Sequence, residues 1–162
     1  MPTALVTHSD CLKHLTPEGH PERIERLQYI LEALDEIDLR REEAPLATDK
    51  DILRIHPIEH LERIQSSRPE TGFKPIDADT FMSPGSLQAA YRAAGGVLKA
   101  VDMVLRREVT NTFVAVRPPG HHAETTTAMG FCFFGNVALG AKYALDFHNL
   151  SRVAIVDFDV HH

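Results

Sequence analysis

The stretch Val153–His162, with the sequence VAIVDFDVHH, decides the fold class of this protein. Its first four residues are apolar and mostly β-branched, which favours a strand that is buried on both faces. Asp157, Asp159 and His161 follow at two-residue steps, and alternate side chains of a strand point to the same side. The stretch therefore predicts a buried strand with a polar site at its carboxyl end.

A second strand of the same kind is predicted at Thr112–Val116, and a helix at about Asn136–Phe147 separates the two strands along the chain. Strand, helix and strand in this order indicate a parallel sheet that is covered by helices. Ligand sites in such sheets lie beyond the carboxyl ends of the strands. The motif RPPGHH at Arg117–His122 follows the first strand, so two histidine pairs are expected at one edge of the sheet.

The first half of the chain adds a short predicted strand at Ala4–Val6 and several helices. One helix is predicted to open at Pro21, since proline is well tolerated in a first helical turn. A helical pair is predicted over Asp49–Ile64 with a break at Pro57. The charge-rich stretch Asp38–Glu43 is interpreted as a solvated connection.

A long helix is predicted after Ser83, which has the side chain of a helix cap. Gly95 and Gly96 lie inside this helix. Each glycine costs about 1 kcal/mol relative to alanine in a helix interior, so their presence predicts close packing against another element.

The composition is that of one soluble globular domain. The chain has 162 residues, of which 43% are hydrophobic and 25% charged, and its net charge of −6 argues against direct binding of nucleic acid. No segment has the length of a membrane-spanning helix or the pattern of a secretory leader. The two cysteines form no CxxC pair, and a cytoplasmic location is expected. The ten histidines are the unusual feature.

The residue types at the end of the chain indicate a metal site. Two carboxylates in a partly buried place repel each other unless a cation compensates. Zinc binds carboxylate and imidazole groups, and catalytic zinc sites use three protein ligands and a water molecule. Asp159 and His161 are the candidate zinc ligands. Solvated loop residues are the competing interpretation.

The adjacent histidines His121 and His122 suit a hydrolase. Such an enzyme needs one group that takes a proton from water and another that protonates the leaving amine. The alternative interpretation is that these are surface histidines beside a turn, with no functional role. That alternative loses weight because the second histidine pair is expected at a neighbouring strand end.

At these residues the sequence resembles the histone deacetylase family, which includes bacterial deacetylases and acetylpolyamine amidohydrolases. The motifs that carry the resemblance are RPPGHHA (Arg117–Ala123), GFCFFGNVALGA (Gly130–Ala141) and VDFDVHH (Val156–His162). GHPER at Gly19–Arg23 and DADTFMSPGS at Asp77–Ser86 look like the class II branch of that family. Ile24 is a departure, because this branch often has proline there.

The resemblance implies an arginase-like fold with α/β/α layers around a parallel sheet. It also implies a zinc-dependent amide hydrolase that removes acetyl groups from lysine side chains or related acylated amines. Asp159 and His161 resemble the zinc ligands of the family. His121 and His122 resemble its tandem catalytic histidines, and Asp157 resembles the carboxylate that orients His121.

The resemblance extends to substrate and potassium binding. Phe131 resembles one wall of a narrow channel for the acyl-lysine stem, Gly130 offers a backbone carbonyl to the substrate, and Asp79 matches a residue at the channel rim. Asp157, Asp159 and the His161 backbone match positions whose oxygens bind potassium in many members. The implied substrates are acetylated lysine, acetylated polyamines and other small acyl-amines.

The family domain is considerably longer than 162 residues. Its third zinc ligand and the tyrosine that stabilises the oxyanion lie downstream of the position that His162 matches. Residues 1–162 are therefore interpreted as the N-terminal part of a single deacetylase-like domain. Taken alone, they are expected to be inactive, to bind zinc weakly and to associate through exposed apolar surface; formation of a homo-oligomer is left open.

Three other interpretations stay open from the sequence. HPIEH at His56–His60 matches the inverted zinc peptidase motif H-x-x-E-H, although Pro57 interrupts the helix that this motif needs. A deacetylase-like domain could also bind acylated ligands without turning them over. A two-metal hydrolase of the arginase type is the third alternative.

Overall fold

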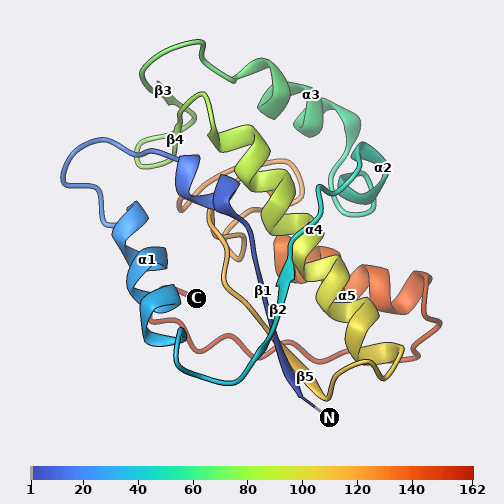
Figure 1. Ribbon diagram of the computed structural model, residues 1–162. Helices are drawn as coiled ribbons and strands as arrows, with labels where there is room; N and C mark the ends of the chain where they lie inside the picture. Colours follow the sequence, from blue (N-terminus) through green and yellow to red (C-terminus); the bar gives the residue numbers. More distant parts are fainter. Residues whose placement is uncertain (1) are drawn as a thin grey trace.

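The computed structural model describes residues 2–162, and it shows a three-stranded parallel sheet with helices around it (Figure 1). The central strand is β1 (Thr3–Thr7), with β2 (Arg40–Glu43) on one side and β5 (Asn111–Val114) on the other. Both pairings are parallel. The predicted first strand, the predicted strand around residues 112–116 and the parallel sheet are confirmed.

Helices cover both faces of this sheet. Ala4 and Val6 of β1 pack with Ala100 and Met103 of the long helix α4 (Ser86–Leu105). Leu5 points to the other side.

On that side, Leu5 belongs to a separate cluster with Leu27 of α1 (Ile24–Ala33) and Cys11 of the short 3-10 helix η1 (Ser9–Lys13). Helix α5 (Asn136–Asp146) packs along α4. The α/β/α layering is therefore confirmed.

The remaining elements lie between the sheet strands β2 and β5 in sequence. They are the short helices α2 (Asp49–Ile52) and α3 (Ile58–Ser66) and the antiparallel pair β3 (Lys74–Pro75) and β4 (Phe81–Met82). Pro57 is the N-cap of α3, which confirms the predicted break. These elements, together with α4 and α5, enclose the largest core cluster around Phe133 and Phe134.

The two glycines inside α4 lie where the helix approaches the segment after β2. A Cβ atom on Gly95 would overlap the carbonyl oxygen of Pro45, and one on Gly96 would lie 3.1 Å from the Ala44 Cβ. The predicted close packing is confirmed.

Ser83 is not the cap of α4, which begins at Ser86 with Gly85 as its N-cap. The Ser83 hydroxyl instead accepts a hydrogen bond from Leu15 N–H and contacts the Ser86 hydroxyl.

Two further predictions of secondary structure are wrong. Asp38–Glu43 contains β2, an edge strand in which the Glu42 carboxylate pairs with Arg40 and with Lys99, each at 2.7 Å. Such charges are typical of exposed sheet edges. Helix α1 begins at Ile24 rather than Pro21, because the backbone of the N-cap residue Arg23 is extended.

The strand predicted within the stretch Val153–His162 does not form. Residues 151–162 are exposed and none of them belongs to a strand; Val156 is 82% and Phe158 95% exposed. A strand that is apolar on both faces needs a hydrogen-bonding neighbour and cover on both sides. Within residues 2–162 nothing provides both.

Among residues 2–162, no helix combines the length and the apolar character needed to span a membrane.

Candidate functional site

The candidate site lies where the chain leaves the carboxyl end of β5. A cavity of about 700 Å³ opens there between β5, the start of α5 and the segment after residue 154. Its polar lining includes His121, Asp157 and Asp159, and its apolar lining includes Val114 and Ile155. Sites beyond the carboxyl ends of parallel strands are the usual arrangement in α/β folds.

His121 and Asp157 form a hydrogen-bonded pair across this cavity. The His121 Nδ1–H donates to Asp157 Oδ2 at 2.9 Å, and the other Asp157 oxygen accepts the Asp159 N–H at 3.0 Å. The His121 bond and, after it, the Asp159 N–H keep the pKa of Asp157 below its usual value. The carboxylate is therefore charged, and it fixes the His121 tautomer with Nε2 left for other partners.

His122 packs between His121 and Gly130. The centroids of the two imidazole rings are 4.2 Å apart. On its other side, the His122 ring leaves no room for a side chain at residue 130, because a Cβ there would lie 2.6 Å from the ring carbons. Gly130 also has a φ of +55°, which favours glycine. The GFCFF loop thus supports the second histidine.

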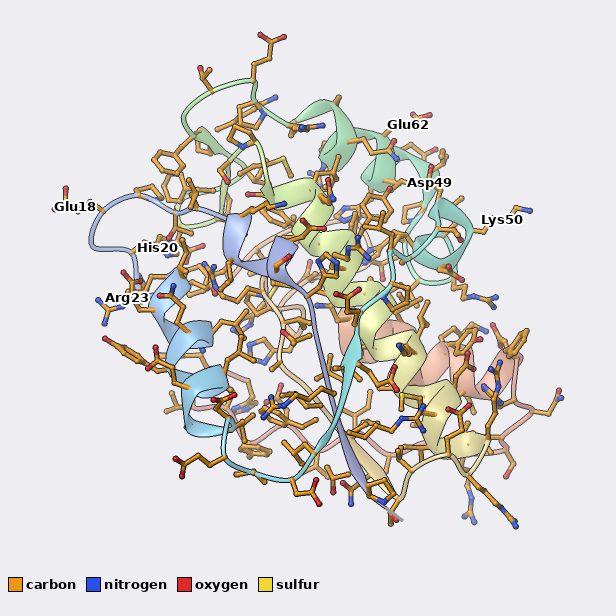
Figure 2. The ribbon with its side chains drawn as sticks, in the orientation of Figure 1. Glu18, His20, Arg23, Asp49, Lys50 and Glu62 are labelled. Atoms are coloured by element: carbon orange, nitrogen blue, oxygen red, sulfur yellow. The ribbon has the colours of Figure 1, made fainter. Side chains whose placement is uncertain are left out.

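Phe131 and Asp79 meet at one edge of this loop, and His20 joins them. The rings of Phe131 and His20 are 4.7 Å apart in an edge-to-face arrangement, and His20 Nε2–H donates to the Asp79 carbonyl at 2.9 Å. The Phe131 N–H also donates to the Thr80 hydroxyl at 3.0 Å. Figure 2 shows His20 in the loop that enters α1, with Glu18 extending outward from the same loop.

Thr80 was not among the predicted site residues, and His20 was considered only for a loop at the channel rim. Each lies within a stretch that the resemblance singled out, GHPER and DADTFMSPGS. Those stretches were the available signal, but sequence spacing could not show that both approach Phe131.

The predicted zinc ligands are only partly brought together. Asp159 lines the cavity beside Asp157, and its carboxylate accepts the His161 N–H at 2.8 Å. His161 is exposed and is not in the cavity lining. The carboxylate and imidazole are suitable zinc donors. The described part of the chain, however, contains no group of three metal-ligating side chains that could hold an ion.

The two histidines of HPIEH are buried and already bonded through every ring nitrogen. His56 Nδ1–H donates to the Thr125 carbonyl, and its Nε2 accepts the Gly135 N–H at 3.0 Å. His60 donates to the Phe133 carbonyl and accepts from Arg63 at 3.0 Å. Neither ring has a free lone pair for a metal, so this geometry argues against an inverted zinc peptidase.

Cys132 is a buried residue of the GFCFF loop, and its thiol is free. Burial raises its pKa to about 12, and its thiol donates to the Gly130 carbonyl at 3.2 Å. A thiol with that pKa is a poor nucleophile. The contact also shows that the Gly130 carbonyl, which the resemblance assigns to substrate binding, is directed toward Cys132 here.

Most of the chain is similar to known proteins. Residues 20–162 match the histone deacetylase domain family. The chain is 40% identical over 148 residues to a histone deacetylase-like amidohydrolase from Pseudomonas aeruginosa, covering 89% of this chain and 39% of that protein. It is 42% identical over 122 residues to polyamine deacetylase HDAC10 from Danio rerio, covering 72% and 18%.

A solved structure, that of the HDA15 HD domain, superimposes with a TM-score of 0.80 at 30% identity, covering 86% of this chain and 43% of that one. The chain spans less than half the length of each of these relatives. The shared fold and the match over residues 20–162 agree with the three motifs that suggested the family. The chain therefore belongs to the histone deacetylase domain family.

Proposed function

We propose that the protein to which this chain belongs is a zinc-dependent amide hydrolase that removes acetyl groups from lysine side chains or related acylated amines. One observation carries the proposal. The His121–Asp157 pair lies beside His122 at the carboxyl end of β5, on a cavity that Asp159 also lines. An adjacent pair of imidazoles, one of them oriented by a carboxylate, is suited to moving protons to and from an amide.

The two histidines together carry out the proton transfers of the proposed mechanism. Asp157 accepts from His121 Nδ1–H and fixes the orientation of the ring, which leaves Nε2 to exchange protons with the reactants. In the proposed reaction one ring of the pair takes a proton from the attacking water. The pair then protonates the nitrogen of the leaving amine, which makes that amine a better leaving group.

Zinc, when bound, would polarise the acyl carbonyl and lower the pKa of a bound water toward roughly 7. Asp159 and His161 would hold it, and Asp157, Asp159 and the His161 backbone would hold potassium. The described residues supply no third zinc ligand. We therefore expect residues 1–162 alone to be inactive and to bind zinc weakly.

The loop edge around Phe131 suits a slender acylated chain. Phe131 and His20 present aromatic rings, and the exposed Asp79 adds a carboxylate at the same edge. A carboxylate there would favour amines that carry further positive charge, such as lysine-rich peptides or polyamines. One relative is named a polyamine deacetylase and another a histone deacetylase-like amidohydrolase, and both substrate classes stay within the proposal.

The test is acetate release by the complete protein that contains residues 1–162. An acetyl-lysine peptide, an N-acetylated polyamine and a non-acylated peptide are each incubated with enzyme that has been stripped of metal and then titrated with zinc. We expect zinc-dependent acetate release from one or both acetylated substrates and no cleavage of the non-acylated peptide. Binding of the acetylated substrates without acetate release would instead identify a non-catalytic binding domain. Maximal activity with two metal ions per chain would favour the arginase type.

A further inference from the structure

The loop that carries the tandem histidines begins at a buried ion pair whose members are not part of the cavity lining. The Arg117 guanidinium donates to both carboxylate oxygens of Glu22, each at 2.6 Å. Arg117 is 3% exposed and Glu22 is 1% exposed. A bidentate pair of this kind fixes direction as well as distance.

Further partners hold both members in place. Arg117 also donates to the backbone carbonyls of Cys11 and His14, at 3.3 and 3.0 Å. The buried His14 ring contacts Glu22 at 3.4 Å on one side and the Ser86 hydroxyl at 2.7 Å on the other. Burial alone would raise the pKa of Glu22, but hydrogen bonds from His14 and Arg117 lower it to about 2, so the carboxylate is charged.

The connection from Arg117 to the histidines is short and stiff. Three residues, Pro118, Pro119 and Gly120, separate Arg117 from His121. Each proline fixes its own φ. Gly120 is wedged against the start of α5, where an added Cβ would lie 2.6 Å from Asn136 N. A displacement of Arg117 is therefore passed on to the rings rather than absorbed in the loop.

We propose that the Glu22–Arg117 pair is a positioning element that sets the direction of the 117–122 loop, so that His121 meets Asp157 and His122 meets Gly130. The pair itself touches no reacting atom. It joins the segment before α1 to the segment that follows β5. The GHPER stretch therefore influences the positions of the two histidine rings indirectly, through Arg117. The inference rests on the proposed function for its catalytic meaning, but its test uses ring positions and needs no substrate.

The test compares Arg117→Lys and Glu22→Gln with the wild-type chain. Lysine keeps the charge of arginine but not its bidentate geometry, and glutamine keeps the shape of glutamate but not its charge. The readout is the imidazole ¹³Cε1–¹H signals of His121 and His122, assigned in the complete protein that contains residues 1–162, together with the melting temperature. We expect both variants to melt at a lower temperature and to shift both ring signals well beyond the wild-type line width.

Asp10→Asn is the matched control. Asp10 is also a buried carboxylate, paired with Lys13 and Arg92, and it contacts neither Arg117 nor Glu22. We expect this control to lower the melting temperature while leaving the two ring signals in place. Unchanged ring signals in the Arg117 and Glu22 variants, or equal shifts in the control, would overturn the proposal. Failure of both variants to fold, with the control folded, would assign the pair to folding alone and would overturn it as well.

In the complete protein, the same variants should lower kcat/KM for an acetylated substrate about 10- to 100-fold. If the complete protein releases no acetate at all, the proposed function fails while the ring signals still decide the positioning role.

Discussion

The contacts of single side chains give the two candidate catalytic histidines different surroundings. His121 is tied to a carboxylate and lies on the cavity, whereas His122 is enclosed by the ring of His121 and by Gly130. Removing either neighbour should therefore have a distinct effect, and each effect can be measured separately.

Replacing Asp157 by asparagine should lower activity without unfolding the protein. Asparagine lacks the negative charge that accepts the His121 Nδ1–H bond, and loss of such an orienting partner is expected to cost about 10- to 100-fold in activity. Because Asp157 is exposed, the stability of residues 1–162 should change little. Measuring kcat, KM and the melting temperature checks this. A large fall in melting temperature with unchanged kcat would contradict the assigned role.

Replacing Gly130 by alanine should displace His122. Gly72 provides a matched control, because it too has a positive φ, +66°, but has no atom near its Cβ position. Gly72→Ala should cost about 1–2 kcal/mol from backbone conformation alone. Gly130→Ala should cost more in urea denaturation and should also shift the His122 ring signals. Equal losses in the two variants would show that the contact with His122 does not matter.

For single residues, the sequence predicted the residue types of the site better than the contacts that these residues make. His121, His122 and Asp157 could be named from motifs, and the structure brings these three together. His20 and Glu22 could not be given partners, because their contacts with Asp79 and Arg117 span 59 and 95 residues of sequence. Local patterns carry no information about such separations.

Some local features of the helices were predicted well. The break at Pro57 and the close approach at Gly95 and Gly96 follow from local chemistry. The edge strand β2 was missed because its sequence, RREE, is charged and contains no apolar alternation. It forms because β1 offers a free edge, which is a property of the sheet rather than of the segment.

The close packing of α4 can be tested with a pair of glycine variants. At Gly95 an added Cβ would meet the Pro45 backbone, which cannot move easily, whereas at Gly140 it would meet the Val97 side chain at 2.5 Å. Gly95→Ala should therefore destabilise the fold by roughly 2 kcal/mol or more, despite the better helix propensity of alanine. Gly140→Ala should be closer to neutral. The urea midpoints of the two variants give the answer, and a stabilised Gly95→Ala protein would contradict this packing.

For the molecule as a whole, pH is expected to act through buried histidines. Burial lowers the pKa of His14 and of His56 below 6.5, so the folded protein keeps both rings neutral. The unfolded chain takes up protons at these residues as the pH falls below about 6.5. The free energy of unfolding should therefore be constant above that pH and should fall below it, by up to about 1.4 kcal/mol per pH unit for each histidine.

Denaturation curves between pH 7.5 and 5.5 check this expectation. His56→Asn should reduce the slope, because asparagine does not titrate and can still donate toward the Thr125 carbonyl. A stability that rises toward pH 5.5, or an unchanged slope in the variant, would contradict the role of the buried rings.

The arrangement of the whole molecule also explains why the strand predicted at Val153–His162 does not form. Its residues are those of a buried strand, yet Val156, Phe158 and Val160 are exposed in this structure. Strand propensity can be predicted from a segment, but the neighbour that completes a strand belongs to the rest of the sheet. At the polar end of the stretch, Asp157 accepts a hydrogen bond from His121 although no strand forms.

The most direct test of the central claim is the rate of acetate release by the complete protein after removal of His122. His148→Ala is the control, because His148 pairs with Asp102 at the far end of α4 and α5. With zinc present and a matched acetylated substrate, His122→Ala should slow release by about 100-fold or more, in line with the usual contribution of a general acid or base. The control should release acetate at nearly the wild-type rate. Equal rates in wild type and His122→Ala would show that the tandem histidines do not carry out the proton transfers assigned to them.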